Sequence, residues 1–263
     1  MPRKFIPVSL AAIALLSNCG GGGGTTGTDS NPPPSLQNAV ISGYEIIDTS
    51  IAAVVGETNE AAGTITIDDL SGTFDYAEGN GLLSGGGSIT FLATEADVVA
   101  YFRAEPDSGS TRQGIVGVLT PSDELPPSIA NPTYTGMASL IVVEDEFLWQ
   151  LTGSSTVEAD FSDGLALVTI DGLSGVVIDA SADSTDVSNV GSLTFSDVSI
   201  VNGSLSGGMA GLDSSQISSS LSGSEIVDLK GAFYGEQATA VGALFLVEDE
   251  ANLSIQGGLI GSR

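Results

Sequence analysis

Hydrophobic and polar residues alternate over long stretches of the second half of the chain. The clearest stretch is 147–161, where one parity is apolar: Phe147, Trp149, Leu151, Val157, Ala159 and Phe161. The other parity is polar: Gln150, Thr152, Ser154, Thr156, Glu158 and Asp160. Successive side chains of a strand point to opposite faces, so this pattern predicts a strand with one buried and one wet face. Segments 226–234 and 252–261 follow the same pattern.

Eight strands fit into residues 133–263, and the absence of proline predicts how they are arranged. All ten prolines lie at or before Pro132. A closed sheet has no edge on which proline is harmless, so the pattern favours an antiparallel up-and-down barrel. Glycines at inward positions suit a narrow barrel that side chains fill. The expected strands are 133–143, 147–161, 165–173, 192–200, 204–210, 226–234, 240–247 and 252–261.

A transmembrane barrel is the alternative. It needs an apolar outer face and aromatic girdles. Here Glu158 and Asp160 fall on the polar face of the clearest strand, and aromatic residues make up only 6% of the chain. The composition therefore favours a water-soluble barrel.

The preceding residues predict a smaller β unit. Short apolar or alternating runs are separated by Gly, Asn and Asp: 39–47, 51–55, 64–67, 72–76, 88–92, 98–103 and 113–119. A proline-rich linker follows at 121–132. We expect a small, handle-like β domain over residues 39–120, the linker, and the barrel domain over 133–263.

The amino end predicts export and anchoring. Arg3 and Lys4 precede an apolar core that is too short to span a bilayer, so residues 1–18 are typical of a signal peptide. Leu16-Ser17-Asn18-Cys19 resembles a bacterial lipobox, although Asn18 departs from its usual small residue; an ordinary secretory leader is the alternative. Residues 19–38 would then hold the lipidated Cys19 and a Gly- and Pro-rich tether. Gly20 follows the Cys at the position where an Asp would retain a lipoprotein at the inner membrane. By resemblance to Gram-negative lipoproteins, we therefore expect the outer membrane, at the cell surface.

Charge and composition limit the partners and the chemistry. The chain holds 33 acidic and 6 basic residues, which argues against nucleic acid and anionic membranes and suits a basic partner. It holds no His and a single Cys, so His-based catalysis and intrachain disulfides are excluded. Asp107-Ser108-Gly109 has the core of an aspartic-protease site but lacks its apolar flank and a second copy. We expect no enzyme, no catalytic residues and no cofactor.

Two further sets of residues are considered as ligand sites, one for calcium and one for haem. Asp179, Asp183 and Asp186 lie in one expected loop, but their spacing does not match a calcium-binding EF-hand. Tyr134, Tyr234, Met137 and Met209 are the side chains of the barrel half that are able to ligate haem. We expect both tyrosine hydroxyls to lie at water instead.

An acidic tetrapeptide occurs twice, as 143–146 and 247–250, at the turns that follow the first and seventh barrel strands. Strands one and eight of a closed barrel are neighbours, so both turns should lie side by side at the end with the long loops. The predicted binding rim consists of Glu144, Asp145, Glu146, Glu248, Asp249 and Glu250. Solubility alone is the alternative explanation for these charges.

Four segments resemble a known family: Pro132–Ala138, Ala159-Asp160-Phe161, Gly231–Ala238 and Val241–Phe245. Over about residues 132–263 they look like the transferrin-binding-protein-like barrel of bacterial surface lipoproteins. The resemblance implies an eight-stranded barrel, often preceded by a β handle, and relatives that capture iron carriers, haem carriers or complement regulators. We therefore expect a non-enzymatic surface lipoprotein that binds a solute or a protein. A structural coat or adhesion module is the alternative; a hydrolase is weaker.

Overall fold

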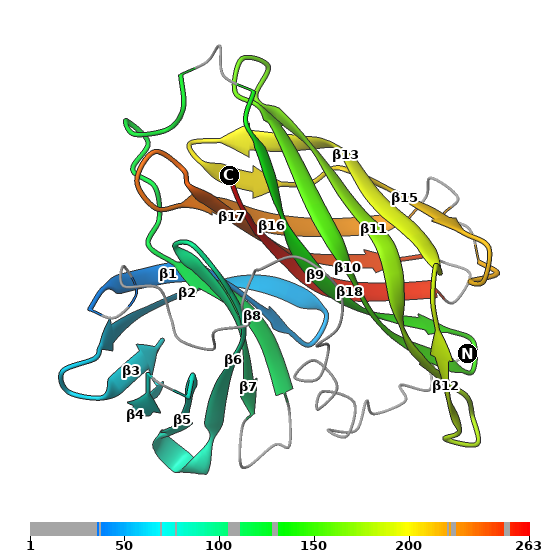
Figure 1. Cartoon of the computed structure of the whole chain (residues 1–263), viewed down its shortest axis with the longest axis horizontal. Helices are drawn as coiled ribbons and strands as arrows, with labels where there is room; N and C mark the ends of the chain where they lie inside the picture. The colour runs from blue at the N-terminus through cyan, green and yellow to red at the C-terminus, as the bar shows by residue number, and fades with distance from the viewer. Residues whose placement is uncertain are drawn as a thin grey trace.

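The computed structural model describes residues 36, 38–68, 70–76, 78–104, 111–127, 131–219, 221, 225–249 and 253–263. In these residues the chain is almost entirely β, with one short 3-10 turn, η3 (Ser84–Gly86). Two antiparallel barrels follow one another along the chain (Figure 1). The expected all-β fold class is therefore confirmed. Within the described ranges, no helix has the length and hydrophobicity to cross a membrane.

The first half forms a closed barrel of eight strands, which we call the small barrel. Its strands are β1 (Val40–Ile47), β2 (Ser50–Asn59), β3 (Thr64–Ile67), β4 (Leu70–Asp75), β5 (Asn80–Leu83), β6 (Ser88–Glu95), β7 (Val98–Ala104) and β8 (Thr111–Gly117). Chain neighbours pair, and β1 closes the ring on β8 from Ser42↔Gly117 to Glu45↔Gly114. The sequence pattern missed only β5, because Asn80 and Gly81 are typical of turns.

The second half forms the large barrel. Its strands are β9 (Thr133–Glu144), β10 (Phe147–Asp160), β11 (Leu165–Ile178), β12 (Ser184–Val187), β13 (Gly191–Val201), β14 (Ser204–Ser206), β15 (Met209–Ser214), β16 (Ile226–Tyr234), β17 (Ala240–Glu248) and β18 (Leu253–Ser262). Strand β18 pairs with β9, and β11 pairs with β13, so the sheet closes into a barrel. The barrel wall consists of β9, β10, β11, β13, β14, β16, β17 and β18.

Strands β12 and β15 are additions to the expected pattern. Strand β12 lies in the expected loop and pairs with the end of β11. The expected strand 204–210 is split into β14 and β15 at Gly207 and Gly208, whose φ angles are 71° and 109°. Glycine occupies this region without steric cost, so the pair allows the kink.

Alternation along the strands fills the large barrel with apolar side chains. Trp149, Leu151, Val157 and Ala159 are buried, as the sequence pattern predicts for one parity of β10. The prediction is wrong for Phe147, which is 45% exposed at the first position of the strand, directly after the β9–β10 turn. The largest interior side chains are Tyr134, Trp149, Phe195, Phe233 and Phe245. The interior is therefore a packed core.

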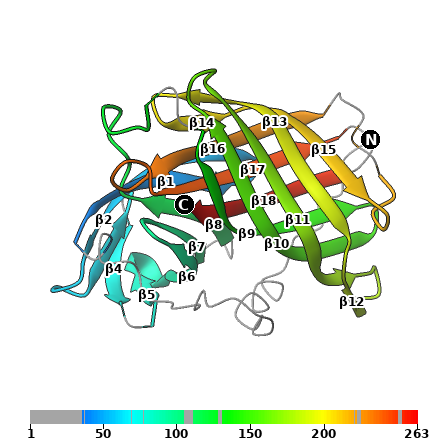
Figure 2. The same ribbon diagram turned by 45° about the horizontal axis from the view of Figure 1, so that its top comes forward.

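The two barrels pack against each other (Figures 1 and 2), and apolar side chains form their interface. It consists of Ile46, Ile51, Val98, Ile115, Ala232, Tyr234, Ala240, Leu244, Leu246 and Ile260. Polar contacts border it: Lys230 Nζ donates to Ile51 O at 3.0 Å, and Ser262 Oγ donates to Glu95 Oε2 at 2.9 Å. Because of this contact β17 is buried on both faces, which explains why its sequence shows no clear alternation.

Candidate functional site

The long connections of the large barrel meet at one end, which we call the mouth. It is formed by the connections that follow β9, β11, β15 and β17. Glu144 of β9 lies opposite Leu253 of β18, and Glu248 of β17 lies opposite the adjacent Ser254. The two acidic turns are therefore neighbours, as the closed-barrel argument predicts.

The six predicted rim carboxylates do not form one exposed row. Glu144 and Asp249 are only 4% and 7% exposed. Asp145 and Glu146 are exposed in the β9–β10 turn, and Glu248 is half-buried. Glu250 lies outside the described residues. The expectation of a shared exposed rim is therefore wrong for Glu144 and Asp249, whose side chains are buried.

Glu144 is covered by the segment after β15. The backbone N–H of Ser219 donates to Glu144 Oε1 at 2.5 Å. Ile217, two residues earlier, is 4% exposed and belongs to the barrel core. The segment therefore crosses from the β13–β15 side of the wall to the end of β9 and covers part of the mouth.

Side-chain hydrogen bonds hold the start of this segment. Ser214 Oγ donates to Val190 O at 2.6 Å and accepts the N–H groups of Gln216 and Ile217 at 3.1 and 2.9 Å. Gln216 Nε2 donates to Ser188 O at 2.9 Å. These contacts fix the segment on the β12–β13 connection.

The three aspartates considered as metal ligands, Asp179, Asp183 and Asp186, have structural roles instead. Asp179 Oδ1 accepts the N–H groups of Ser181 and Asp183 at 2.8 and 3.1 Å, which makes it a turn-forming residue. Asp186 lies in β12 opposite Val176. Across the described ranges, no three His, Cys, Asp or Glu side chains are grouped to hold a metal ion. Asp107 lies outside the described residues.

The haem candidates are not brought together either. Both tyrosines are 0% exposed, so the expectation that their hydroxyls lie at water is wrong. Burial raises the pKa of Tyr134 to about 12 and also raises the pKa of Tyr234. Tyr134 lies inside the large barrel and Tyr234 in the interface, whereas Met137 and Met209 are exposed on the outer wall.

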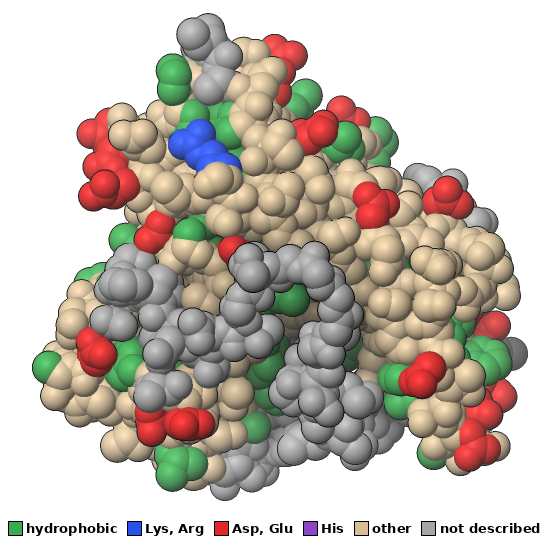
Figure 3. Space-filling model, in the orientation of Figure 1, with side chains coloured by type: hydrophobic (Ala, Val, Ile, Leu, Met, Phe, Trp, Pro, Cys, Tyr) green, Lys and Arg blue, Asp and Glu red, His purple; other side chains and the backbone are tan. Residues whose placement is uncertain are grey.

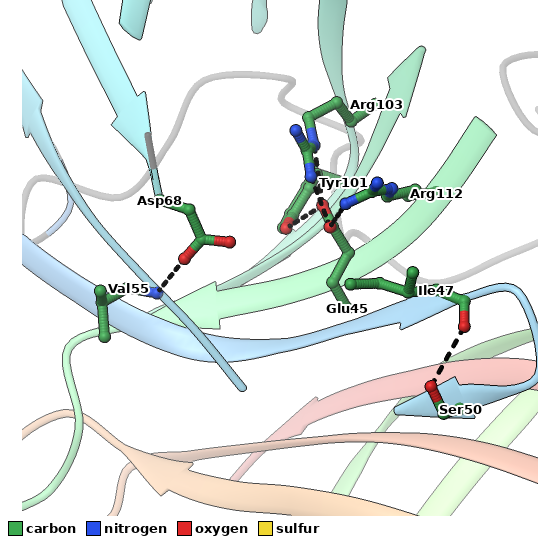
Figure 4. A network of polar contacts seen from close by, with 8 residues as sticks. All are labelled: Glu45, Ile47, Ser50, Val55, Asp68, Tyr101, Arg103 and Arg112. Carbon is green, nitrogen blue, oxygen red and sulfur yellow. Dashed lines mark hydrogen bonds and ion pairs between the residues drawn. The ribbon is translucent and has the colours of Figure 1, made fainter. Parts of the chain in front are cut away.

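The small barrel contains a buried ionic cluster that was not predicted from the sequence (Figure 4). Glu45, 0% exposed, accepts hydrogen bonds at Oε1 from Tyr101 Oη (2.8 Å) and Arg103 Nε (2.9 Å). Its Oε2 accepts from Arg103 Nη2 (2.6 Å) and Arg112 Nη1 (3.2 Å). Burial, followed by the charge of Glu45, raises the pKa of Tyr101 well above its usual value.

The cluster joins strands where the small barrel closes. Glu45 is the last residue of β1 that pairs with β8, while Tyr101 and Arg103 lie on β7. Four donors surround the carboxylate, so it is suited to join strands. The available sequence signal was that Glu45 shares its parity with the buried Ile41 of the same strand.

The surface charge is predominantly negative. Acidic side chains are spread over the face shown in Figure 3, at its upper edge, left side and lower right. The four basic residues after Lys4 are Arg103, Arg112, Lys230 and Arg263. Arg103 is buried, Lys230 contacts the small barrel, and the Arg263 guanidinium lies 5.9 Å from the centre of the Tyr134 ring. A partner with positive charge therefore meets little repulsion.

Comparisons with known proteins agree with this architecture. No protein-family model and no curated protein sequence matches the chain. Among solved structures, transferrin binding protein B of Haemophilus parasuis (a double mutant) is similar with a TM-score of 0.57 and 17% identity, covering 85% of this chain and 44% of the other.

The isotype 1 protein of Neisseria meningitidis gives a TM-score of 0.55 and 16% identity, covering 86% of this chain and 44% of the other. Intact Ap-TbpB, with its N and C lobes, gives 0.54 and 17%, covering 85% and 46%. The chain thus spans less than half of these proteins. It has the two-barrel fold found in transferrin binding protein B.

Proposed function

We propose that this chain is a non-enzymatic, lipid-anchored surface protein that binds a protein partner through the mouth of the large barrel. The observation that carries the proposal is the packed interior of that barrel. Tyr134, Trp149, Phe195, Phe233 and Phe245 occupy the volume in which a barrel of this size holds a small ligand. A partner would then meet the outside of the molecule, where the connecting loops gather.

The fold supports a protein as the partner. The similar solved structures are named for binding transferrin, and they share the two-barrel arrangement at low sequence identity. The acidic surface favours a partner with a basic face, because charge complementarity speeds association. Of the five rim residues that the structure describes, Asp145 and Glu146 are exposed and Glu248 is half-buried, so these three are open to such a partner.

The anchor follows from the sequence. Cys19 and the tether lie outside the described residues, and the proposal rests on the lipobox-like segment 16–19. Labelled fatty acid should enter the wild-type chain, and Cys19→Ser should move the protein from the membrane fraction to the soluble fraction. Unlabelled wild-type protein would exclude the lipid anchor and leave the binding proposal to be judged on its own.

Capture experiments test the binding role. Residues 36–263, immobilised and exposed to host or environmental fluids, should recover a partner protein; a coat module would recover mainly its own copies. Asp145→Asn/Glu146→Gln/Glu248→Gln should slow association about tenfold at low salt. Glu144 and Asp249 are kept, because their replacement would disturb the buried contacts of the mouth. An association rate indifferent to salt and to these changes would exclude the mouth as the binding face.

A further inference from the structure

A depression lies on the outer wall of the large barrel, at the end opposite the mouth. It has a volume of about 430 Å³ and is formed by β10, β11, β13 and, at one side, by Asn131 and the first residue of β9, Thr133. Leu165 and Leu167, two residues apart on β11, lie in it and are each 39% exposed. Thr156 and Thr169 occupy the same outer face nearby, so the two leucines interrupt a hydroxyl-rich surface.

A β-bulge opens the sheet beside Leu167. The β11–β13 register runs from Ala166↔Val198 to Val168↔Phe195, so two residues of β13, Ser196 and Asp197, face the single residue Leu167. Asp197 has a φ angle of 55° and is exposed. A bulge locally bends its strand and redirects side chains, which here leaves Leu167 without a cross-strand apolar neighbour on β13.

Carboxylates lie on both sides of the leucines. On β10, Glu158 is opposite Leu167 and Asp160 is opposite Leu165, while Asp197 lies across on β13. Asp160 stays ionised, because hydrogen bonds from Ser162 lower the pKa of its carboxyl group. The basic residues of the chain after Lys4 are engaged elsewhere, at Glu45, at Ile51 and over Tyr134.

We propose that this depression docks a segment of a partner protein in which an apolar side chain is flanked by Lys or Arg. The apolar side chain would cover Leu165 and Leu167. Neighbouring strands are about 4.8 Å apart, so long cationic side chains on either side would reach Glu158 or Asp160 and Asp197. The leucines complement an apolar side chain, and the carboxylates on both sides of them attract cationic side chains. An anionic membrane or a nucleic acid would be repelled by the same carboxylates.

The site is independent of the mouth, so its test does not depend on the proposed function. The probe is the peptide Lys-Leu-Lys-Leu-Lys-amide with a fluorophore on its N-terminal amine in place of an acetyl group, titrated with the 36–263 protein and followed by fluorescence anisotropy. Leu165→Thr/Leu167→Thr removes the apolar floor at constant charge, and threonine is well accommodated in strands. Glu158→Gln/Asp197→Asn removes two charges and keeps both leucines. Asp145→Asn/Glu146→Gln removes the same charge at the mouth and is the matched control.

Each docking-site variant should weaken peptide binding about tenfold, while the mouth control should stay within about twofold of wild type. Amide chemical shifts should change on β10, β11 and β13. The proposal would be overturned if the leucine variant bound the peptide as well as wild type, or if the mouth control were weakened as much as the docking-site variants. Either result would mean that binding follows net charge alone. Circular dichroism and thermal unfolding identify any variant that fails to fold; Leu167→Val, which keeps an apolar floor, should then retain binding.

Discussion

The buried carboxylate of Glu144 accepts a hydrogen bond from the backbone N–H of Ser219, at 2.5 Å, across the mouth of the large barrel. The contact joins the end of β9 to the segment that follows β15. It changes the role of Glu144 from an exposed rim charge to a residue that holds a covering segment in place. The accessible charge of the mouth is correspondingly smaller than the sequence suggests.

We expect Glu144→Ala to loosen this segment. A hydrogen bond to a charged group contributes about 1.5–3 kcal/mol, so the free energy of unfolding should fall by about that amount. Hydrogen exchange at the Ser219 amide should become faster, while exchange in β10 should respond only to the global change. Glu146→Ala is the matched control, since Glu146 is exposed and its replacement should alter stability by less than about 0.5 kcal/mol. Equal effects of both changes would show that the bond does not hold the segment.

Glu45→Ala should destabilise the small barrel strongly. It removes the carboxylate that Arg103 binds through two nitrogens inside the protein. Breaking a buried pair by removing one partner costs about 3–5 kcal/mol, because the remaining charge is left in a poorly solvated site. Urea unfolding measures the change, and Glu57→Ala, on the exposed face of β2, is the control. A loss below about 1 kcal/mol would mean that the cluster is readily rehydrated.

Stability should decline at alkaline pH. Tyr101, Tyr134 and Tyr234 are fully buried, and burial raises the pKa of each above the usual value of about 10. Above pH 10 the unfolded chain therefore releases protons that the folded chain keeps, so the free energy of unfolding falls as pH rises. For Tyr134, this contribution is complete below pH 10 and is lost as pH rises through about 12. Tyrosinate absorbance should rise together with the loss of β circular dichroism; Tyr134→Phe should reduce the loss. Titration of Tyr134 itself near pH 10 in the folded protein, measured as the difference between the wild type and Tyr134→Phe, would contradict its burial.

The large barrel should depend on its neighbour. A fragment of residues 133–263 would expose the apolar outer positions Leu244, Leu246 and Ile260, which the small barrel covers in the whole chain. We expect the fragment to self-associate and to unfold at lower temperature than the same barrel in the whole chain. In the fragment, Leu244→Thr/Leu246→Thr should restore a monomer, because both changes lie on the outer face. Sedimentation measures the outcome, and a monomeric unmodified fragment would show that the interface is dispensable.

Local pattern determined which residues form strands and which share a face. The alternation over 147–161 predicts the buried parity of β10, and the absence of proline after Pro132 agrees with the closed wall. Closure, in turn, predicts that the two acidic turns are neighbours, and the β9–β18 register places them side by side. These features depend on the two-residue period of a strand and on the closure of the barrel. Both leave a pattern in the sequence, as alternation of side chains and as the absence of proline.

Tertiary structure decided what covers each face. Strand β17 is buried on both sides because the small barrel packs on it, and Glu144 is buried because the segment with Ser219 crosses the mouth. The partners of Glu45 lie 56 to 67 residues further along the chain, and the bulge at Asp197 exists only in the pairing of β11 with β13. Periodicity fixes the direction of a side chain but not its neighbour. Contacts between distant segments therefore determined the ionic cluster, the covered mouth and the leucine depression.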